Sequence, residues 1–122
     1  RKVKREIALR SCDGGEKKVM FEPKIRNRQT EMLMQAVLAL ETTEDAYRFF
    51  EDLCTIPEIR SIAQRLEVAY LLRKKETYQK IADETGASSA TISRVKRSLS
   101  YGADGYDRVL DKIRIPEEEA RE

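Results

Sequence analysis

The chain has 122 residues, of which 38% are charged and 40% are apolar, and its formal net charge at pH 7 is +2. This composition suits one small helical domain with a thin core, and five glycines with three prolines leave little room for a loop-rich β fold. The near-balanced charge excludes a polycation, and because no apolar run reaches the roughly 18 residues of a membrane span, no membrane partner is expected.

The first 24 residues (1–24) form a basic extension whose structure the sequence leaves open. A turn signal at residues 12–15 separates two short β-like runs, at residues 7–10 and 17–21, which is compatible with a small hairpin. A flexible basic arm is at least as compatible, because an isolated hairpin is only marginally stable in water. We place a helical domain after this extension, at residues 25–115.

The helical domain is predicted to begin with a helix over residues 27–41. Residues 32–40 are apolar except for Gln35, so this helix is apolar nearly all round. Such a helix must be buried nearly all round, and the few helices of a small chain cannot easily enclose one of their number. A second subunit is the simplest way to bury it, and the sequence therefore predicts a homodimer.

Two more helices are predicted next. Thr43 is a good N-cap for the first of them, since Glu44 and Asp45 then fall in its first turn, where the helix dipole favours acids. The following helix starts near Pro57 and runs to about Lys75. Its apolar stripe has helical spacing and consists of Ile59, Ile62, Ala63, Leu66, Ala69 and Leu72, widened by Val68 and Leu71.

Residues 78–99 are predicted to form two short helices joined by a tight turn. Ala82 is small enough to let the second helix cross the first closely, Gly86 makes the turn, and Ser88 suits the N-cap position of the second helix. The apolar stripe of the second helix consists of Ile92, Val95 and Leu99. This order of a small residue, a glycine and an apolar residue is the spacing of a helix-turn-helix.

The outer side of the second helix favours contact with double-stranded DNA. Residues 88–101 include three basic residues and no acidic ones, and the side opposite the apolar stripe is small or basic. Short side chains let a helix sit deep in the major groove, and arginines bind guanine edges or phosphates. The alternative is the solvated surface of an ordinary helical hairpin. We predict DNA contacts from Gln79, Lys80, Ser88, Ser89, Ala90, Ser93, Arg94, Lys96 and Arg97.

A last helix is predicted over residues 106–115, with Val109, Leu110 and Ile113 on one side. Residues 116–122 begin with a proline and carry four acidic residues, and we predict that they form a solvated acidic tail.

Two residue types limit the chemistry of the chain. Histidine is absent, which removes the commonest general base and the commonest metal ligand. Carboxylates and lysines remain, but they form no catalytic constellation, so we predict neither an enzyme nor a metal site. Cys12 and Cys54 lie far apart without metal-type spacing. We interpret them as reduced thiols of a cytoplasmic protein.

Four motifs carry a resemblance to a known family: YRFFEDLCT at residues 47–55, QRLEV at 64–68, TYQKI at 77–81 and TGASSATISRVKRSL at 85–99. With these motifs, about residues 27–115 resemble the Trp-repressor superfamily, and more closely its YerC/YecD-type branch. The resemblance implies an all-α, intertwined homodimer in which the second helix of the helix-turn-helix enters the major groove.

The resemblance also raises the question of a tryptophan corepressor. The family member that binds tryptophan uses an arginine on the central helix and a second arginine, followed by glycine, on the reading helix. Arg94 matches the second arginine, whereas Gln64 stands at the first position, with Arg65 adjacent, and Val95 replaces the glycine. Because Val95 would occupy space that an indole ring needs, we expect no tryptophan corepression and either no effector or a different one.

Two classes of function remain open. The preferred one is a sequence-specific, DNA-binding transcriptional regulator that reads the major groove. The alternative is a non-regulatory DNA-anchoring or protein-interaction module on the same fold. Steep salt dependence of binding to a specific duplex favours the regulator, and tight binding to a protein without DNA affinity favours the interaction module.

Overall fold

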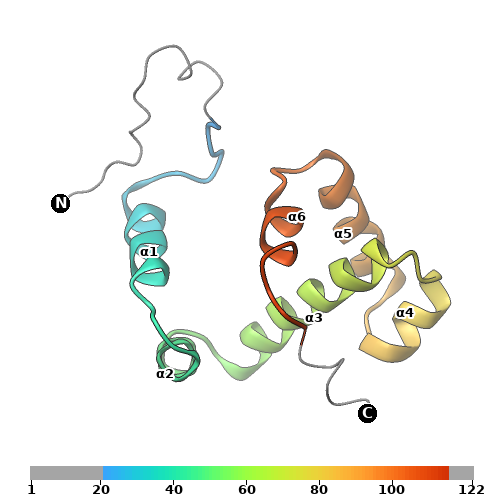
Figure 1. Cartoon of the computed structure of the whole chain (residues 1–122), viewed down its shortest axis with the longest axis horizontal. Helices are drawn as coiled ribbons and strands as arrows, with labels where there is room; N and C mark the ends of the chain where they lie inside the picture. The colour runs from blue at the N-terminus through green and yellow to red at the C-terminus, as the bar shows by residue number, and fades with distance from the viewer. Residues whose placement is uncertain (1–20, 116–122) are drawn as a thin grey trace. The chain divides into compact units, whose positions relative to one another are not determined.

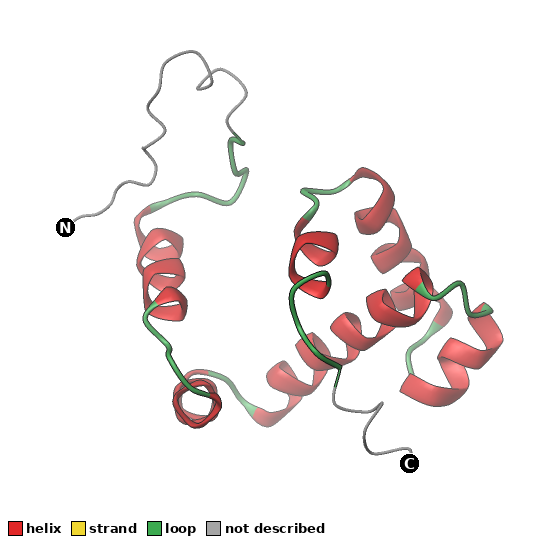
Figure 2. Ribbon diagram, in the orientation of Figure 1, coloured by secondary structure: helices red, strands yellow, loops and turns green. Residues whose placement is uncertain are grey.

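The computed structural model describes residues 21–115, and over this range the chain forms helices and no strand (Figures 1 and 2). The helices are α1 (Arg28–Leu38), α2 (Thr43–Leu53), α3 (Ile56–Arg73), α4 (Tyr78–Thr85), α5 (Ser89–Tyr101) and α6 (Gly105–Leu110). The predicted all-α fold class is therefore confirmed. Most of the predicted basic extension with its hairpin, Cys12, and the predicted acidic tail at residues 116–122 lie outside the described residues.

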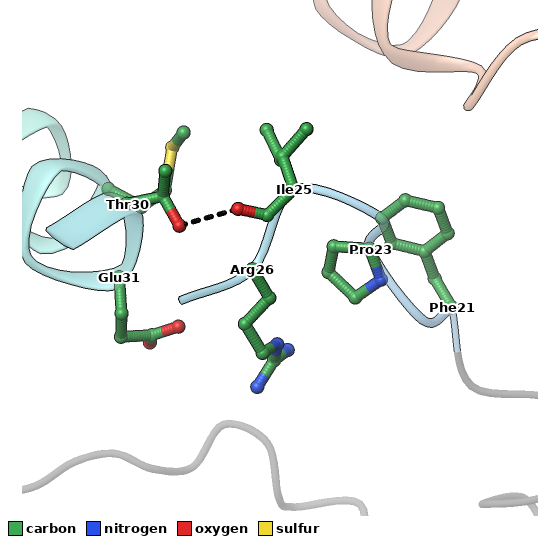
Figure 3. A pocket seen from close by; sticks show the side chains of 7 residues that line it. Phe21, Pro23, Ile25, Arg26, Thr30 and Glu31 are labelled. Atoms are coloured by element: carbon green, nitrogen blue, oxygen red, sulfur yellow. Dashed lines mark hydrogen bonds between the residues drawn. The ribbon is translucent and has the colours of Figure 1, made fainter. Parts of the chain in front are cut away.

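The chain divides after Leu38 into two compact units. In the first unit the Asn27 side chain accepts a hydrogen bond from the Thr30 backbone N–H at 2.9 Å, and the Thr30 hydroxyl accepts one from the Asn27 N–H at 2.8 Å. The Thr30 hydroxyl also donates to the Ile25 carbonyl at 2.8 Å, so the segment before α1 turns back toward the helix (Figure 3). The apolar side chains that line the small pocket at this turn are Phe21, Pro23, Ile25 and Met34.

Helix α1 is shorter than predicted and ends at Leu38 rather than at residue 41. Residues 39–41 form a non-helical connection to Thr42, which has an extended backbone and caps α2. Within its own unit α1 buries no residue, and Met32 and Leu38 are 58% and 77% exposed. The all-round burial that the sequence predicts for this helix therefore requires a surface outside its own unit.

Helix α2 begins at Thr43, and its N-cap is Thr42 rather than the predicted Thr43. The Thr42 hydroxyl accepts a hydrogen bond from the Asp45 backbone N–H at 3.0 Å. Glu44 and Asp45 lie in the first turn, as predicted. The predicted cap is wrong by one residue because two adjacent threonines compete for the position, and composition alone does not decide between them.

Helix α3 begins with a reciprocal cap. The Thr55 hydroxyl accepts from the Glu58 backbone N–H at 3.2 Å, and the Glu58 carboxylate accepts from the Thr55 N–H at 2.8 Å. Pro57 lies in the first turn, which confirms the predicted start. The helix ends at Arg73, close to the predicted Lys75. At Lys75 the backbone is left-handed, with φ of 67°.

The core lies between the second half of α3 and the helices α4 and α5, which pack beside it in Figure 1. The buried residues are Val68, Ala69, Leu71, Ile81, Ala87, Ile92 and Val95. Burying one large aliphatic side chain stabilises a fold by about 1.5–3 kcal/mol. The four bulkiest fully buried side chains, two isoleucines and two valines, therefore hold these three helices together.

The first half of α3 does not share this core. Ile62, which belongs to the predicted apolar stripe, is 45% exposed, whereas Val68 and Ala69 are fully buried. An open apolar groove runs beside the middle of α3, and the residues that line it include Ala63, Leu66, Leu110, Ile113 and Ile115. The predicted stripe is thus continuous along α3, but its fully buried residues lie in the second half of the helix.

Helix α6, Gly105–Leu110, is shorter than the predicted helix over residues 106–115. The Lys112 N–H donates to the Val109 carbonyl at 2.9 Å, three residues back, so the last turn is tighter than an α-helix. The apolar spacing from Val109 to Ile113 continues past this point, which is why the sequence predicts too long a helix.

Arg73 ties α6 to the end of α3. Its Nη2 lies 2.6 Å from Asp111 Oδ1, and its Nε lies 3.4 Å from Asp107 Oδ1. The hydrogen bond to Asp111 is the main cause that raises the pKa of Arg73 above its ordinary value. The guanidinium is therefore a permanent cation that anchors the segment after the helix-turn-helix.

Candidate nucleic-acid interface

The turn between α4 and α5 has the geometry that the sequence predicts. Gly86 ends α4 with φ of 75°, a left-handed conformation that glycine adopts without steric cost. The Thr85 hydroxyl accepts from the Ala87 N–H at 3.1 Å inside the turn, and the Ser88 hydroxyl accepts from the Thr91 N–H at 3.1 Å to cap α5. The predicted roles of Gly86 in the turn and Ser88 as N-cap are confirmed.

Helix α5 is attached to the core by one face. Ile92 and Val95 are each 1% exposed, and Leu99 is half-buried beside them. Ala82 of α4 also packs against this core. The predicted inward stripe is confirmed, and the opposite face of α5 is turned outward by the helical repeat.

All of the residues predicted to contact DNA are exposed: Gln79, Lys80, Ser88, Ser89, Ala90, Ser93, Arg94, Lys96 and Arg97. Those on α5 that lie opposite the buried stripe are small or basic. Arg94 and Arg97 make no hydrogen bond or ion pair with another residue of the described range. Residues 88–101 contain no acid, so no carboxylate within α5 itself neutralises the two guanidinium groups.

The predicted residues on α4 already have partners. Gln79 Nε2 donates to Asp83 Oδ1 at 3.0 Å. Lys80 Nζ lies 3.3 Å from Glu76 Oε1 and 3.9 Å from Glu84 Oε2. Exposed ion pairs of this kind contribute only about 0–1 kcal/mol, so phosphate could displace these carboxylates, but α4 is less ready to bind an anion than α5.

The sequence reasoning missed Tyr78 as part of this surface. Tyr78 is the first residue of α4, and the Nζ of Lys96 on α5 lies 5.9 Å from the centre of its ring. This distance suits a cation–π contact, which holds the ammonium group of Lys96 toward the start of α4. The signal was an aromatic residue directly after the capping threonine, but only the packing of α5 on α4 brings the two side chains together.

Neither a metal site nor a membrane span is found in residues 21–115. No group of three or more Cys, Asp or Glu side chains in this range could hold a metal ion. Cys54, at the end of α2, is a free thiol. None of the described helices is long and apolar enough to cross a membrane.

An all-helical fold in which α4, Gly86 and α5 present an exposed basic helix defines a helix-turn-helix protein. Residues 28–114 match the family model described as Trp repressor protein. The chain belongs to this family, and the resemblance predicted from the four motifs is confirmed. The family is built on a regulator fold and not on an enzyme fold.

Three similar proteins agree with this assignment. The chain is 55% identical over 97 residues to the uncharacterized protein YerC of Bacillus subtilis strain 168, a match that covers 80% of this chain and 93% of YerC. The crystal structure of a TrpR-like protein from Eubacterium eligens ATCC 27750 is 57% identical, with a TM-score of 0.70, and the match covers 73% of this chain and 92% of that one. The crystal structure of a candidate Trp repressor from Staphylococcus aureus is 50% identical, with a TM-score of 0.70. That match covers 73% of this chain and 89% of the other.

Proposed function

We propose that this protein is a cytoplasmic, sequence-specific DNA-binding transcriptional regulator that reads the major groove with α5. One observation carries the proposal: Arg94 and Arg97 are exposed on α5 without an internal partner among the described residues, opposite the buried Ile92 and Val95. An unpaired guanidinium on a helix that also exposes small side chains can reach base edges and phosphates in the groove.

We further propose that the protein acts as a homodimer. The apolar side chains that α1 exposes within its unit and the exposed Ile62 on α3 support a second copy as their cover. A two-fold dimer places two reading helices about one turn of DNA apart, roughly 34 Å, which lets them enter successive major grooves. Membership of the Trp repressor family favours the same arrangement.

The proposed regulator does not depend on tryptophan. Val95 is buried in the core, and its branched side chain fills the position at which the resemblance requires a glycine. Gln64, which stands where the resemblance requires an arginine, already donates to the Thr85 carbonyl at 3.1 Å. Both observations support a DNA-binding form without this corepressor. Calorimetry should detect no saturable binding of tryptophan, and micromolar binding would contradict the proposal.

Selection from a random duplex pool tests the function. We expect the wild-type protein to enrich one sequence family and to bind it at least about a thousandfold more tightly than random duplex. The affinity for both should fall steeply with salt, because phosphate contacts release counterions. Equal binding to selected and random duplexes would support a non-regulatory DNA anchor instead. Absence of any binding would support a protein-interaction module.

A further inference from the structure

A hydrogen bond joins the central helix to the turn of the helix-turn-helix. The side chain of Gln64, part-buried on α3, donates from its Nε2 to the backbone carbonyl of Thr85 at 3.1 Å. Twenty-one residues separate the two partners in the sequence. This contact therefore links parts of the fold that no local propensity would bring together.

The carbonyl of Thr85 is available to accept a hydrogen bond from outside its own helix. It belongs to the last residue of α4, where backbone carbonyls have no partner within the helix and carry the negative end of the helix dipole. A Cβ atom built on Gly86 would lie 3.9 Å from Gln64 Nε2, so the amide of Gln64 lies close to the turn. The side chain thus satisfies the helix end and lies beside the residue that reverses the chain.

Apolar contacts also attach α4 and α5 to α3. Ile81, Ile92 and Val95 are buried against the second half of α3, but hydrophobic burial is nondirectional and tolerates small rotations of one helix on another. A hydrogen bond weakens steeply when its angle departs from linearity. Gln64 therefore adds a directional restraint on the orientation of the helix-turn-helix to the restraint that the apolar contacts supply.

We infer that Gln64 is a positioning residue that fixes the angle of the reading helix α5 on α3, and through it the separation of the two reading helices in the dimer. The inference rests on the proposed function, because only a dimer that binds two half-sites converts this angle into a preferred spacing. Gln64 itself contacts no DNA in this account. Its influence is on which half-site spacing is bound and not on which bases are read.

The first variant is Gln64→Met, which keeps the length of the side chain and removes the donor. Gln64→Glu is the second, because a carboxylate cannot donate to a carbonyl at pH 7.5 and the substitution keeps the shape. Arg65→Met is the matched control: Arg65 neighbours Gln64 on α3, but its Nη1 donates to Ser61 Oγ of the same helix at 2.9 Å and not to the turn. The loss of its charge should weaken all duplexes alike.

Two measurements decide the inference. In the first, the wild-type protein and each variant select duplexes from the same random pool, and the spacing between the recovered half-sites is counted. We expect one dominant spacing for wild type and Arg65→Met. For both Gln64 variants the preference over spacings that differ by one base pair should fall by about three- to tenfold, the factor that one hydrogen bond supplies, with the half-site sequences unchanged.

The second measurement needs no DNA. Amide hydrogen exchange at Gly86 and Ala87 should become about three- to tenfold faster in both Gln64 variants than in wild type and Arg65→Met, because the turn opens more easily. Unchanged exchange would overturn the inference whether or not DNA binds. Faster exchange with an unchanged spacing distribution would also overturn it and would leave Gln64 a structural residue. If wild type enriched no duplex, the proposed function would fail, and the half-site part of the inference would fall with it.

Discussion

The two halves of α3 differ in how far the rest of the unit covers them. The second half is closed: Val68 and Ala69 are fully buried beneath α4 and α5. The first half is open, since Ile62 is nearly half exposed. One predicted apolar stripe along the helix thus meets two environments. The closed half supports a helix-turn-helix that is complete within one chain, and the open half leaves apolar surface exposed.

The two proposed functions, DNA binding and dimer formation, belong to different halves of α3. The closed half places the residues of α5, which we propose to contact DNA, on a rigid support. The open half, with the exposed side chains of α1, supplies the apolar area that we propose a second copy covers. Substitutions in the two halves should therefore fail in different ways, and the following predictions run from the largest expected effect to the smallest.

Ile92→Asp should unfold the closed half. The side chain is 1% exposed, so the variant places an unpaired carboxylate among apolar residues, and the free energy of unfolding should fall by more than about 3 kcal/mol. Chemical denaturation followed by circular dichroism measures this loss. Ser93→Asp is the control on the exposed face of the same helix, and its stability should stay within about 0.5 kcal/mol of wild type. Equal losses in the two variants would contradict the closed core.

Ile62→Asp should leave the fold intact and separate the subunits. Within one chain the new carboxylate can reach water, but in the proposed dimer it would be buried, and the dissociation constant should rise by more than about a hundredfold. Light scattering should give twice 14.1 kDa for wild type and 14.1 kDa for the variant at the same concentration. A wild-type protein that stays monomeric would remove the basis for the dimer.

Arg97→Ala and Ser93→Ala should affect DNA binding by α5 in two different ways. Arg97 lies nearer the end of the helix and is expected to meet phosphate, so its loss should weaken selected and random duplexes alike and lower the salt slope by roughly one unit. Ser93 lies nearer the start and is expected to approach base edges, where one contact contributes about 1–3 kcal/mol of discrimination. Binding curves at several salt concentrations separate the two. If Arg97→Ala changed the preferred sequence at an unchanged slope, these roles would be wrong.

Tyr78→Leu should have the smallest effect. Its ring holds the ammonium group of Lys96, and loss of an exposed cation–π contact should weaken DNA binding about two- to fivefold. The same substitution in a Lys96→Ala background should then cost almost nothing. A double-mutant cycle on the selected duplex measures this coupling. Independent losses from the two substitutions would show that Tyr78 acts without Lys96.

Local sequence signals predict the helix-turn-helix well. Ala82, Gly86 and Ile92 define the helix-turn-helix within a few residues of each other, and their roles depend on short-range geometry that spacing encodes. The Thr42 cap was missed because its neighbour has the same side chain. These successes and errors are both local, which is why the errors are as small as one residue.

Contacts between residues far apart in the chain could not be predicted from the sequence. The bond from Gln64 to Thr85 and the contact of Lys96 with Tyr78 join helices whose relative orientation no periodicity specifies. The sequence also predicted one continuous buried stripe on α3, because hydrophobic spacing does not state which unit supplies the cover. Ile62 and Ala69 lie seven residues apart on one face of α3, and they differ in what packs on them.

Chemical-shift mapping with a duplex recovered by the selection tests the central claim most directly. We predict that the amide signals which move on DNA addition cluster on the exposed face of α5, around Ser93, Arg94 and Arg97, and at the start of α4. The signals of Met32 and Met34 on α1 and of Ile62 on α3 should stay where they are in the free protein. Shifts centred on these apolar residues, with α5 unaffected, would contradict the assignment of DNA binding to the closed half.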